Sequence, residues 1–339
     1  MSRSPDECFV VAVDGGSSST RALVGNQTGE VVGVGVGGPT GLFTDEAGLR
    51  RLEGALRAAI GGALKSAGVS ADRVATAFLG LTGVFDEQDD GRKASDIAWH
   101  LLPRARIHVR GDAAPAFLAA SCGLPGVLVY SGTGSIAYGV DDRGNQVRSG
   151  GWGYLVDDRG GGFRIGIEAL EAVFRQSDGR GPETKLSEVV LAHFAAVDPG
   201  ALLRLIYLDK VLDRARVAAL VPLVRSAADD GDTVARELLA EAAHRLVELA
   251  QAVGRRLPGL YGGRIYPAGG VFRAGPWLRE PFDSELAVEM PEAVVCEPAF
   301  PPVVGSYLMA LQHSGRLLDD RVLGGIRRTR RKWEELEPS

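Results

Sequence analysis

The sequence is poor in cysteine and has no cluster of metal-ligating side chains. Its three cysteines, Cys8, Cys122 and Cys296, lie more than a hundred residues apart, and none stands in a C-x-x-C motif. Such spacing argues against a structural zinc site, an iron–sulfur cluster held by one chain and a disulfide framework. We therefore expect the chain to fold by burying apolar surface alone.

The sequence also lacks a charge excess that would attract a polyanion. Its 38 Lys and Arg residues against 43 Asp and Glu give a net charge of -5, so no overall field favours nucleic acid or an anionic membrane. No apolar run approaches the ~20 residues that cross a bilayer. The opening residues, MSRSPDE, lack the apolar segment of a signal peptide. We expect a cytoplasmic protein that acts on a small molecule, with neither nucleic acid nor a membrane as partner.

Two common nucleotide-binding motifs are missing as well. There is no G-x-x-x-x-G-K-[ST] and no G-x-G-x-x-G that enters a helix, which excludes P-loop and Rossmann interpretations. What is present is an ordinary globular composition, 45% apolar and 24% charged, in 339 residues. That length is a little over twice a typical domain of ~150 residues and predicts two domains.

A strand-rich pattern occurs twice in the chain. Residues 9–36 alternate strands with turns, as FVVAVD, GGSSST, RALVG, NQTG and EVVGVGV. The pattern returns roughly 115 residues later, in GVLVYSGTGSIAYGVDDRGNQV. Two copies predict the duplication of a β-rich α/β unit, with the active site between the copies.

Helical patterns fill much of the remaining chain. Apolar spacing predicts helices at 46–68, 89–101 and 113–122, a nearly all-helical stretch at 185–257 and a last helix at 301–312. The segment RIYPAGGVF reads as a short strand that enters a Gly-Gly turn. The basic-then-acidic end, residues 327–339, is predicted to be a solvated helix or a frayed end, with partner contact as the second interpretation.

Each copy of the repeat carries a turn rich in glycine and hydroxyl residues. Glycine lets the backbone approach an anion, successive N–H groups and hydroxyls donate to phosphate oxygens, and Asp14 suits a hydrated Mg²⁺. A turn of this kind alone is more often only a hairpin turn, but the two together favour phosphate binding. The predicted phosphate contacts are Gly15, Gly16, Ser17, Ser18, Ser19, Thr20, Gly132, Thr133, Gly134 and Ser135.

Asp112 has two compatible interpretations. It precedes a predicted helix and is an ordinary N-cap residue. It also follows a predicted strand at the expected junction of the domains, where a carboxylate can accept the proton of a substrate hydroxyl that attacks a γ-phosphate. A capped side chain is held still, which suits that chemistry.

Two further glycine-rich segments are candidates. Residues 150–162 place Trp152 and two carboxylates among six glycines, which resembles a polar substrate cradle, although Trp152 is also explained as a core anchor. Gly269 and Gly270 form either a tight turn or a bare backbone on which an adenine ring lies. The five histidines lack any ligand spacing and are interpreted as structural or surface residues: His100, His108, His193, His244 and His313.

These motifs together resemble a known family. VAVDGGSSSTRALV and LVYSGTGSIAYGV resemble the two phosphate motifs, and YPAGGVF the adenosine motif, of the actin, sugar-kinase and Hsp70 superfamily. Within it, GDAAPA, SGTGS and GGWGYLVDDRGGGFRIG resemble the N-acetylglucosamine kinases of the BadF/BadG/BcrA/BcrD ATPase family. The similarity runs from about residue 9 to 312, and four motifs in order with the GGWG loop are specific.

The resemblance implies an α/β fold of two ribonuclease H-like, actin-like ATPase lobes, with the active site in the interdomain cleft. The expected N-terminal lobe is residues 1–113 with a C-terminal helix at about 303–339, and the expected C-terminal lobe is residues 114–302 with a helical insertion. Family members bind ATP and Mg²⁺ and are commonly homodimers.

The resemblance also implies a role for each matching residue. Asp14 becomes the Mg²⁺-linked acid, Asp112 the catalytic base, and Gly269 and Gly270 the adenosine contacts. The implied sugar contacts are Thr40, Gly41, Thr82, Gly83, Asp112, Gly151, Trp152, Gly153 and Asp158.

Two positions depart from the family pattern. Gly41 stands where the family usually has Asn, which removes a sugar contact worth on the order of 1 kcal/mol. Arg159 stands where the family usually has Glu, a change of two charge units that favours an anionic or differently substituted substrate.

The predicted function is transfer of the ATP γ-phosphate to a hydroxyl, expected to be the 6-OH, of an amino sugar such as N-acetylglucosamine or glucosamine. A sugar-sensing ATP-binding protein is one alternative. A partner-coupled ATPase that activates a radical dehydratase is another, but it requires bridging cysteines that Cys122 and Cys296 do not match.

Overall fold

The computed structural model describes residues 8–84, 86–208 and 213–336. The chain forms two compact units, unit 1 (Met1–Gly123 and Pro298–Ser339) and unit 2 (Leu124–Glu297). The sequence analysis placed the boundaries between the two lobes earlier for the first, after residue 113, and later for the second, at about residue 303. The helix α3 (Ala113–Ser121) instead belongs to unit 1, because it packs closely on α11 (Pro302–His313). A Cβ at Gly305 of α11 would collide with the carbonyl oxygen of Pro115.

Unit 1 is built on a five-stranded sheet in the order β3-β2-β1-β4-β5. Antiparallel pairing joins β1 (Phe9–Gly15) to β2 (Thr20–Asn26) and β2 to β3 (Val31–Gly37), whereas β4 (Val74–Leu81) and β5 (Arg106–Arg110) run parallel to β1. Alternate residues of β1 enter two different apolar clusters, one on each face of the sheet. A sheet covered on both faces explains why this strand is almost wholly apolar.

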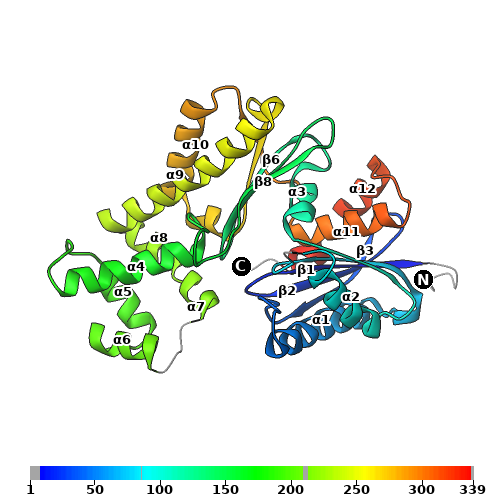
Figure 1. Ribbon diagram of the computed structural model, residues 1–339, viewed down its shortest axis with the longest axis horizontal. Helices are drawn as coiled ribbons and strands as arrows, with labels where there is room; N and C mark the ends of the chain where they lie inside the picture. The colour runs from blue at the N-terminus through cyan, green and yellow to red at the C-terminus, as the bar shows by residue number, and fades with distance from the viewer. Residues whose placement is uncertain (1–7, 85, 209–212, 337–339) are drawn as a thin grey trace. The chain divides into compact units, whose positions relative to one another are not determined.

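Helices cover both faces of this sheet (Figure 1). On one face lie α1 (Glu46–Ala67) and α2 (Asp90–Leu101), and on the other α3, α11 and α12 (Asp320–Arg328). The glycines of β3 explain how closely α1 approaches, since a Cβ at Gly33, Gly35 or Gly37 would collide with backbone atoms of α1. The period-two glycines of VVGVGVG are therefore a helix-packing surface.

The end of the chain is more ordered than the sequence predicted. Residues 327–336 complete α12 and form α13 (Arg330–Glu334), and residues 337–339 lie outside the described residues. Trp333 is only 9% exposed, packs edge-on against Phe300 and donates from its indole N–H to the carbonyl of Ile326 at 3.1 Å. The tail is thus part of the unit 1 core, because its one large aromatic side chain is buried there.

Unit 2 repeats the same strand pattern. Its sheet has the order β10-β9-β6-β7-β8, with β6 (Gly126–Ser131), β7 (Ser135–Val140) and β8 (Gln146–Gly150) antiparallel. The strands β9 (Arg264–Ala268) and β10 (Val294–Val295) are added in parallel. An antiparallel meander followed by parallel strands in each unit confirms the predicted duplication.

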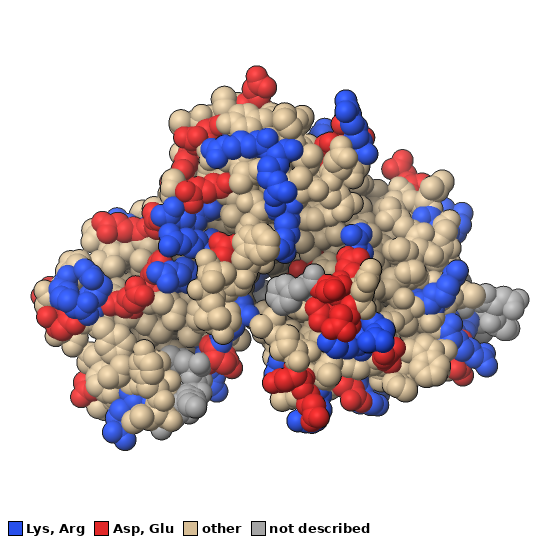
Figure 2. All heavy atoms as spheres, in the orientation of Figure 1, with Lys and Arg blue, Asp and Glu red and all other residues tan. Residues whose placement is uncertain are grey.

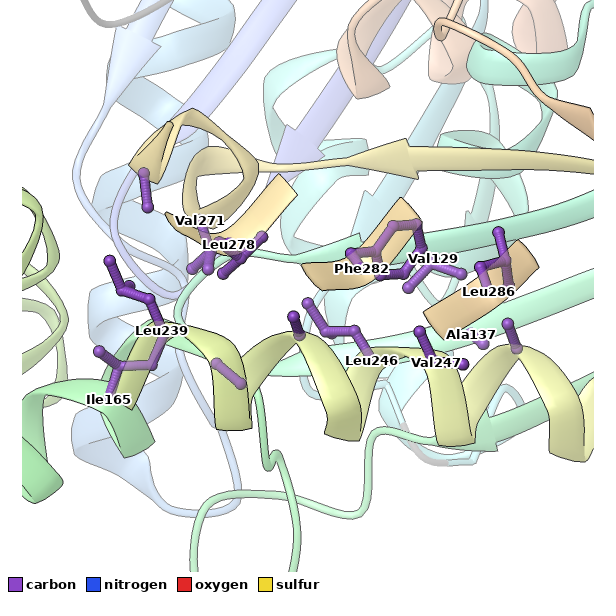
Figure 3. Close-up of a cluster of buried hydrophobic side chains, with 14 of the residues drawn as sticks. Val129, Ala137, Ile165, Leu239, Leu246, Val247, Val271, Leu278, Phe282 and Leu286 are labelled. Carbon is purple, nitrogen blue, oxygen red and sulfur yellow. The ribbon is translucent and has the colours of Figure 1, made fainter. Parts of the chain in front are cut away.

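The core of unit 2 lies between this sheet and two helices, α9 (Thr233–Arg256) and α10 (Pro276–Glu289). Figure 3 shows Val129 and Ala137 of the sheet meeting Leu246 of α9 and Phe282 of α10. The short 3-10 turns of the chain are η1 (Ala71–Arg73), η2 (Pro258–Leu260) and η3 (Gly270–Ala274).

The predicted helical stretch of unit 2 is divided into several helices that surround a second small core. Leu170, Val173, Val190 and Leu202 belong to this cluster. Within the predicted stretch, 185–257, lie α5 (Leu186–His193), α6 (Pro199–Tyr207), α7 (Arg214–Ala218), α8 (Val221–Asp229) and α9, whereas α4 (Gly162–Ser177), which lines the same small core, precedes it and was not predicted.

The surface carries charges of both signs. Figure 2 shows acidic and basic side chains interspersed over the face in view. Among the described residues, no helix is both long and apolar enough to cross a membrane.

Candidate active site

The first glycine-rich turn joins β1 to β2 and is tied to two other segments of unit 1. Gly16 N–H donates to the carbonyl of Ser19 at 2.9 Å, which closes the turn. Thr40 N–H donates to the carbonyl of Gly16 at 3.1 Å, and Thr82 N–H donates to that of Gly15 at 2.8 Å. A Cβ at Gly15 would lie 2.8 Å from Cγ2 of Thr40. The structure therefore brings the predicted phosphate turn together with two predicted sugar contacts.

Thr82 connects this turn to Asp112. Its hydroxyl donates a short hydrogen bond to the Asp112 carboxylate. Asp112 occupies the N-cap position of α3, but its side chain makes no cap hydrogen bond, so the capping interpretation was wrong in that respect. The helical backbone of Asp112 turns the carboxylate toward Thr82 instead.

The electrostatics of Asp112 suit a proton acceptor. Burial raises the pKa of its carboxyl above the ordinary value, and the hydrogen bond from Thr82 opposes that rise. A carboxylate with a raised pKa holds a transferred proton more readily than an exposed one does. This is the property that a general base for hydroxyl attack requires.

The loop at Thr40 and Gly41 is held by an arginine of α1. Arg51 donates to the carbonyl of Thr40 at 3.2 Å and to that of Leu42 at 2.5 Å. Gly41 has φ +57° and Gly83 has φ +93°, and a Cβ at Gly83 would lie 2.9 Å from the carbonyl oxygen of Gly41. Because asparagine also tolerates the left-handed region, the backbone at Gly41 still suits the residue that the family usually has there.

The second turn, between β6 and β7, is joined to residues 159–163. Ser131 Oγ donates to the carbonyl of Gly160 at 2.7 Å, and Ser135 Oγ donates to that of Arg159 at 2.7 Å. Gly162 N–H donates to the carbonyl of Gly132 at 2.8 Å. Ser135 was predicted to contact phosphate, yet its hydroxyl proton is engaged within the protein. The hydroxyl of Ser135 therefore holds the loop at Arg159 to the turn.

Asp158 lies directly against the second turn. It is 5% exposed with φ +60°, and a Cβ at Gly134 would collide with its carboxylate. Burial raises the pKa of Asp158, whereas Arg214 and the backbone N–H groups of Gly153 and Ser135 act in the opposite direction. Residue 134 must be glycine, because the Asp158 carboxylate occupies the space that a Cβ atom would need.

The tryptophan of the glycine-rich loop is not a core anchor. Trp152 is 65% exposed, and Cζ of Arg148 lies 4.2 Å from the centre of its ring. Gly151 and Gly153 on either side have φ of +70° and +94°, values that favour glycine. The loop thus presents an aromatic ring to solvent, as a substrate cradle would.

Gly269 is fixed by packing against the phosphate turn. It has φ +101°, and a Cβ there would collide with the carbonyl of Ser131. Gly270 then begins η3. Gly269 and Gly270 therefore lie beside the second turn within unit 2.

Asp14 is the single carboxylate that the sequence analysis assigned to Mg²⁺. Asp14 is partly buried near the end of β1, just before the turn. Among the described residues, no group of three or more His, Cys, Asp or Glu side chains can hold a metal ion. Mg²⁺ commonly binds through one or two carboxylates, water and substrate phosphates rather than in a cage of protein ligands, so a single carboxylate fits that mode.

Sequence reasoning missed one charged residue of this region. Arg214, at the start of α7, lies 3.8 Å from the Asp158 carboxylate, whereas the side chain of Arg159 is exposed. Arg214 stands outside every motif, so no sequence signal marked it.

Comparison with curated proteins identifies related kinases. The chain is 28% identical over 306 residues to an N-acetylmuramic acid/N-acetylglucosamine kinase of Clostridium acetobutylicum, with 89% of this chain and 98% of that protein covered. It is 30% identical over 243 residues to the N-acetyl-D-glucosamine kinase of Dictyostelium discoideum, with 70% of this chain and 76% of that protein covered.

Comparison with solved structures confirms the predicted α/β, actin-like ATPase fold. A Chromobacterium violaceum protein provisionally described as an N-acetylglucosamine kinase aligns with a TM-score of 0.74 and 27% identity, over 91% of this chain and 100% of that chain. A ROK family glucokinase from Streptomyces griseus, in complex with glucose and AMPPNP, shares the fold with a TM-score of 0.58 and 15% identity, over 90% and 99% of the two chains.

The family resemblance is confirmed over most of the sequence. A sequence model of the BadF/BadG/BcrA/BcrD ATPase family matches residues 11–310. The ordered motifs, the duplicated fold and this match agree, and the chain belongs to the BadF/BadG/BcrA/BcrD ATPase family.

Proposed function

We propose that this protein is an ATP-dependent amino-sugar kinase that phosphorylates a hydroxyl, the 6-OH, of N-acetylglucosamine, glucosamine or a close relative. The observation that carries the proposal is the carboxylate of Asp112, held by Thr82, whose backbone in turn is bonded to the first glycine-rich turn. Two relatives that are described as amino-sugar kinases, and that this chain matches over most of their length, support the substrate class.

In the proposed reaction, Asp112 accepts the proton of the sugar hydroxyl as its oxygen bonds to the γ-phosphorus. The bond between that phosphorus and the bridging oxygen breaks, and ADP leaves. Phosphoryl transfer of this kind depends mainly on positioning and on neutralising charge. The Thr82 hydroxyl fixes the carboxylate, and the raised pKa of Asp112 favours proton acceptance.

The two turns provide the proposed phosphate contacts. Residues 15–20 and 132–135 would contact phosphate oxygens through backbone N–H groups other than those of Gly16 and Gly132, which donate within the turns. Gly269 with Gly270 would contact adenosine. Asp14 would hold Mg²⁺, which neutralises charge on the phosphates when bound.

The proposed sugar contacts come from several loops. Thr40, Gly41, Thr82 and Gly83 belong to unit 1, and Gly151, Trp152, Gly153 and Asp158 to unit 2. The missing amide at Gly41 favours acceptors that need one contact fewer. We further propose that the enzyme acts in the cytoplasm as a homodimer.

The direct test is ADP release with Mg-ATP, measured by a coupled assay against a panel of acceptors. The panel is N-acetylglucosamine, glucosamine, N-acetylmannosamine, N-acetylmuramic acid, glucose and a blank without sugar. We expect ADP release that depends on an amino sugar. Equal release in the blank would favour a partner-coupled ATPase, and sugar binding without ADP release would favour a sensor.

A further inference from the structure

Arg214 of unit 2 has hydrogen-bonding capacity that the protein itself does not use. Its Nε atom is buried and has no hydrogen-bond partner. A buried N–H of a charged group is costly when unpaired, and such groups in native proteins usually have a partner. The missing partner therefore points to a ligand.

The carboxylate nearest to Arg214 does not supply that partner. Nη2 of Arg214 lies 3.8 Å from Asp158 Oδ2, which is an ion pair but exceeds hydrogen-bond length. Arg214 therefore makes no hydrogen bond to Asp158, and its guanidinium keeps donors for another anion.

The guanidinium is nevertheless held in a defined place. Its Cζ atom lies 4.5 Å from the centre of the Tyr154 ring, in cation–π geometry. Tyr154 packs edge-on against Phe163 at 5.2 Å, and Phe163 N–H donates to the carbonyl of Thr133 at 2.9 Å. A continuous set of contacts thus links Arg214 to the predicted phosphate turn.

The helix that carries Arg214 is also fixed. A Cβ at Gly166 of α4 would collide with the carbonyl of Val217 of α7, and a Cβ at Gly162 would lie 3.4 Å from Ala218 Cβ. The short helix α7 therefore packs closely on the first turns of α4. Because the Arg214 side chain is 26% exposed, a ligand from solvent can reach the guanidinium.

We propose that Arg214 is an anion-binding residue of the active site, which donates to an anionic oxygen of a reactant beside Asp158. This inference rests on the proposed kinase function. Two reactants offer such an oxygen, a phosphoryl group of ATP and a carboxylate on the acceptor sugar. Arg214, rather than Arg159, is then the residue that adapts this site to a charged substrate.

The test measures ligand binding at equilibrium, so it does not depend on turnover. The variants are Arg214→Gln and Arg214→Lys, with Arg216→Gln as the matched control, because Arg216 is an exposed arginine on the same helix. Isothermal titration with Mg²⁺ and AMPPNP is compared with adenosine, and titration with N-acetylmuramic acid is compared with N-acetylglucosamine. Thermal melting of each variant reports its folding.

We expect Arg214→Gln to weaken one charged ligand by about 10-fold to 100-fold, as for a lost hydrogen bond to a charged group. Loss of AMPPNP binding with adenosine unchanged identifies a phosphoryl group. Loss of N-acetylmuramic acid binding with N-acetylglucosamine unchanged identifies an acceptor carboxylate. Arg214→Lys should retain part of the affinity, and Arg216→Gln should match the wild type.

The proposal is overturned if Arg214→Gln binds all four ligands as the wild type does, or if it only lowers the melting temperature. That outcome would leave the kinase function intact wherever sugar-dependent ADP release is present. Conversely, absence of ADP release with every sugar would reject the kinase function, while the AMPPNP and adenosine titrations would still decide whether Arg214 binds an anion.

Discussion

Thr82→Val should change the pH dependence of the reaction as well as its rate. The substitution keeps the shape of the side chain but removes the hydroxyl that donates to Asp112. That hydrogen bond lowers the pKa of Asp112 against the effect of burial, so its loss raises the pKa further. Since the proposed base acts in its ionised form, the acid limb of kcat/KM against pH should move to higher pH.

Thr82→Val should also have a lower kcat at pH values above the acid limb, where Asp112 is ionised. Without the hydroxyl, the carboxylate loses the group that sets its orientation, and misplacement of a reacting group by about 1 Å can lower a rate by roughly 100-fold. We expect kcat to fall by about 10-fold to 100-fold, because neighbouring backbone still restrains Asp112.

The assay is coupled ADP release from pH 5 to 9 with saturating Mg-ATP and the acceptor found by the sugar panel. Thr82→Ser is the matched control, since it keeps the donor and should keep both the position of the limb and most of kcat. An unchanged acid limb and an unchanged kcat in Thr82→Val would refute the assigned role of this hydrogen bond.

The remaining predictions concern stability. Gly305→Ala should destabilise the fold by about 1–3 kcal/mol through overpacking against Pro115, whereas Gly61→Ala, on an open face of α1, should stabilise it by about 0.5–1 kcal/mol; urea denaturation that ranks them the other way would contradict the packing of α11 on α3. Trp333→Ala should lower the free energy of unfolding by about 3–5 kcal/mol in the same assay. A change near zero would show that the tail does not contribute to the core. Asp112→Asn should be more stable than the wild type, by an amount that grows as pH rises above the ordinary Asp pKa of 3.8. The reason is that the native wild type holds the Asp112 proton at pH values where the unfolded chain releases it. A difference in melting temperature that shrinks with rising pH would contradict this prediction.

Much of the fold could be predicted because its signals are local. Alternation and turn residues located the two meanders, and apolar spacing located α1 within one residue of its observed end. The glycines of β3 were predicted only as part of a strand. Their reason is the close approach of α1, and such contacts between segments distant in sequence leave no local pattern.

The candidate site shows the same division. Asp112 and the two turns were found from sequence because each combines glycine or an acid with the end of a strand. The hydrogen-bond partners of Asp112 and Ser135 were not found from sequence, because they lie far away in the chain. Thr82 is 30 residues from Asp112, and Arg159 is 24 residues from Ser135. Arg214 belongs to no motif and was found only because the fold places it beside Asp158.

The measurement that tests the central claim most directly is sugar-dependent ADP release by Asp112→Asn beside the wild type. Asp96→Asn serves as the control, because Asp96 is an exposed acid on α2. We predict that turnover of Asp112→Asn falls by at least ~100-fold, while AMPPNP affinity and the Asp96→Asn rate stay near the wild-type values. Near-normal turnover of Asp112→Asn would contradict its role as the base.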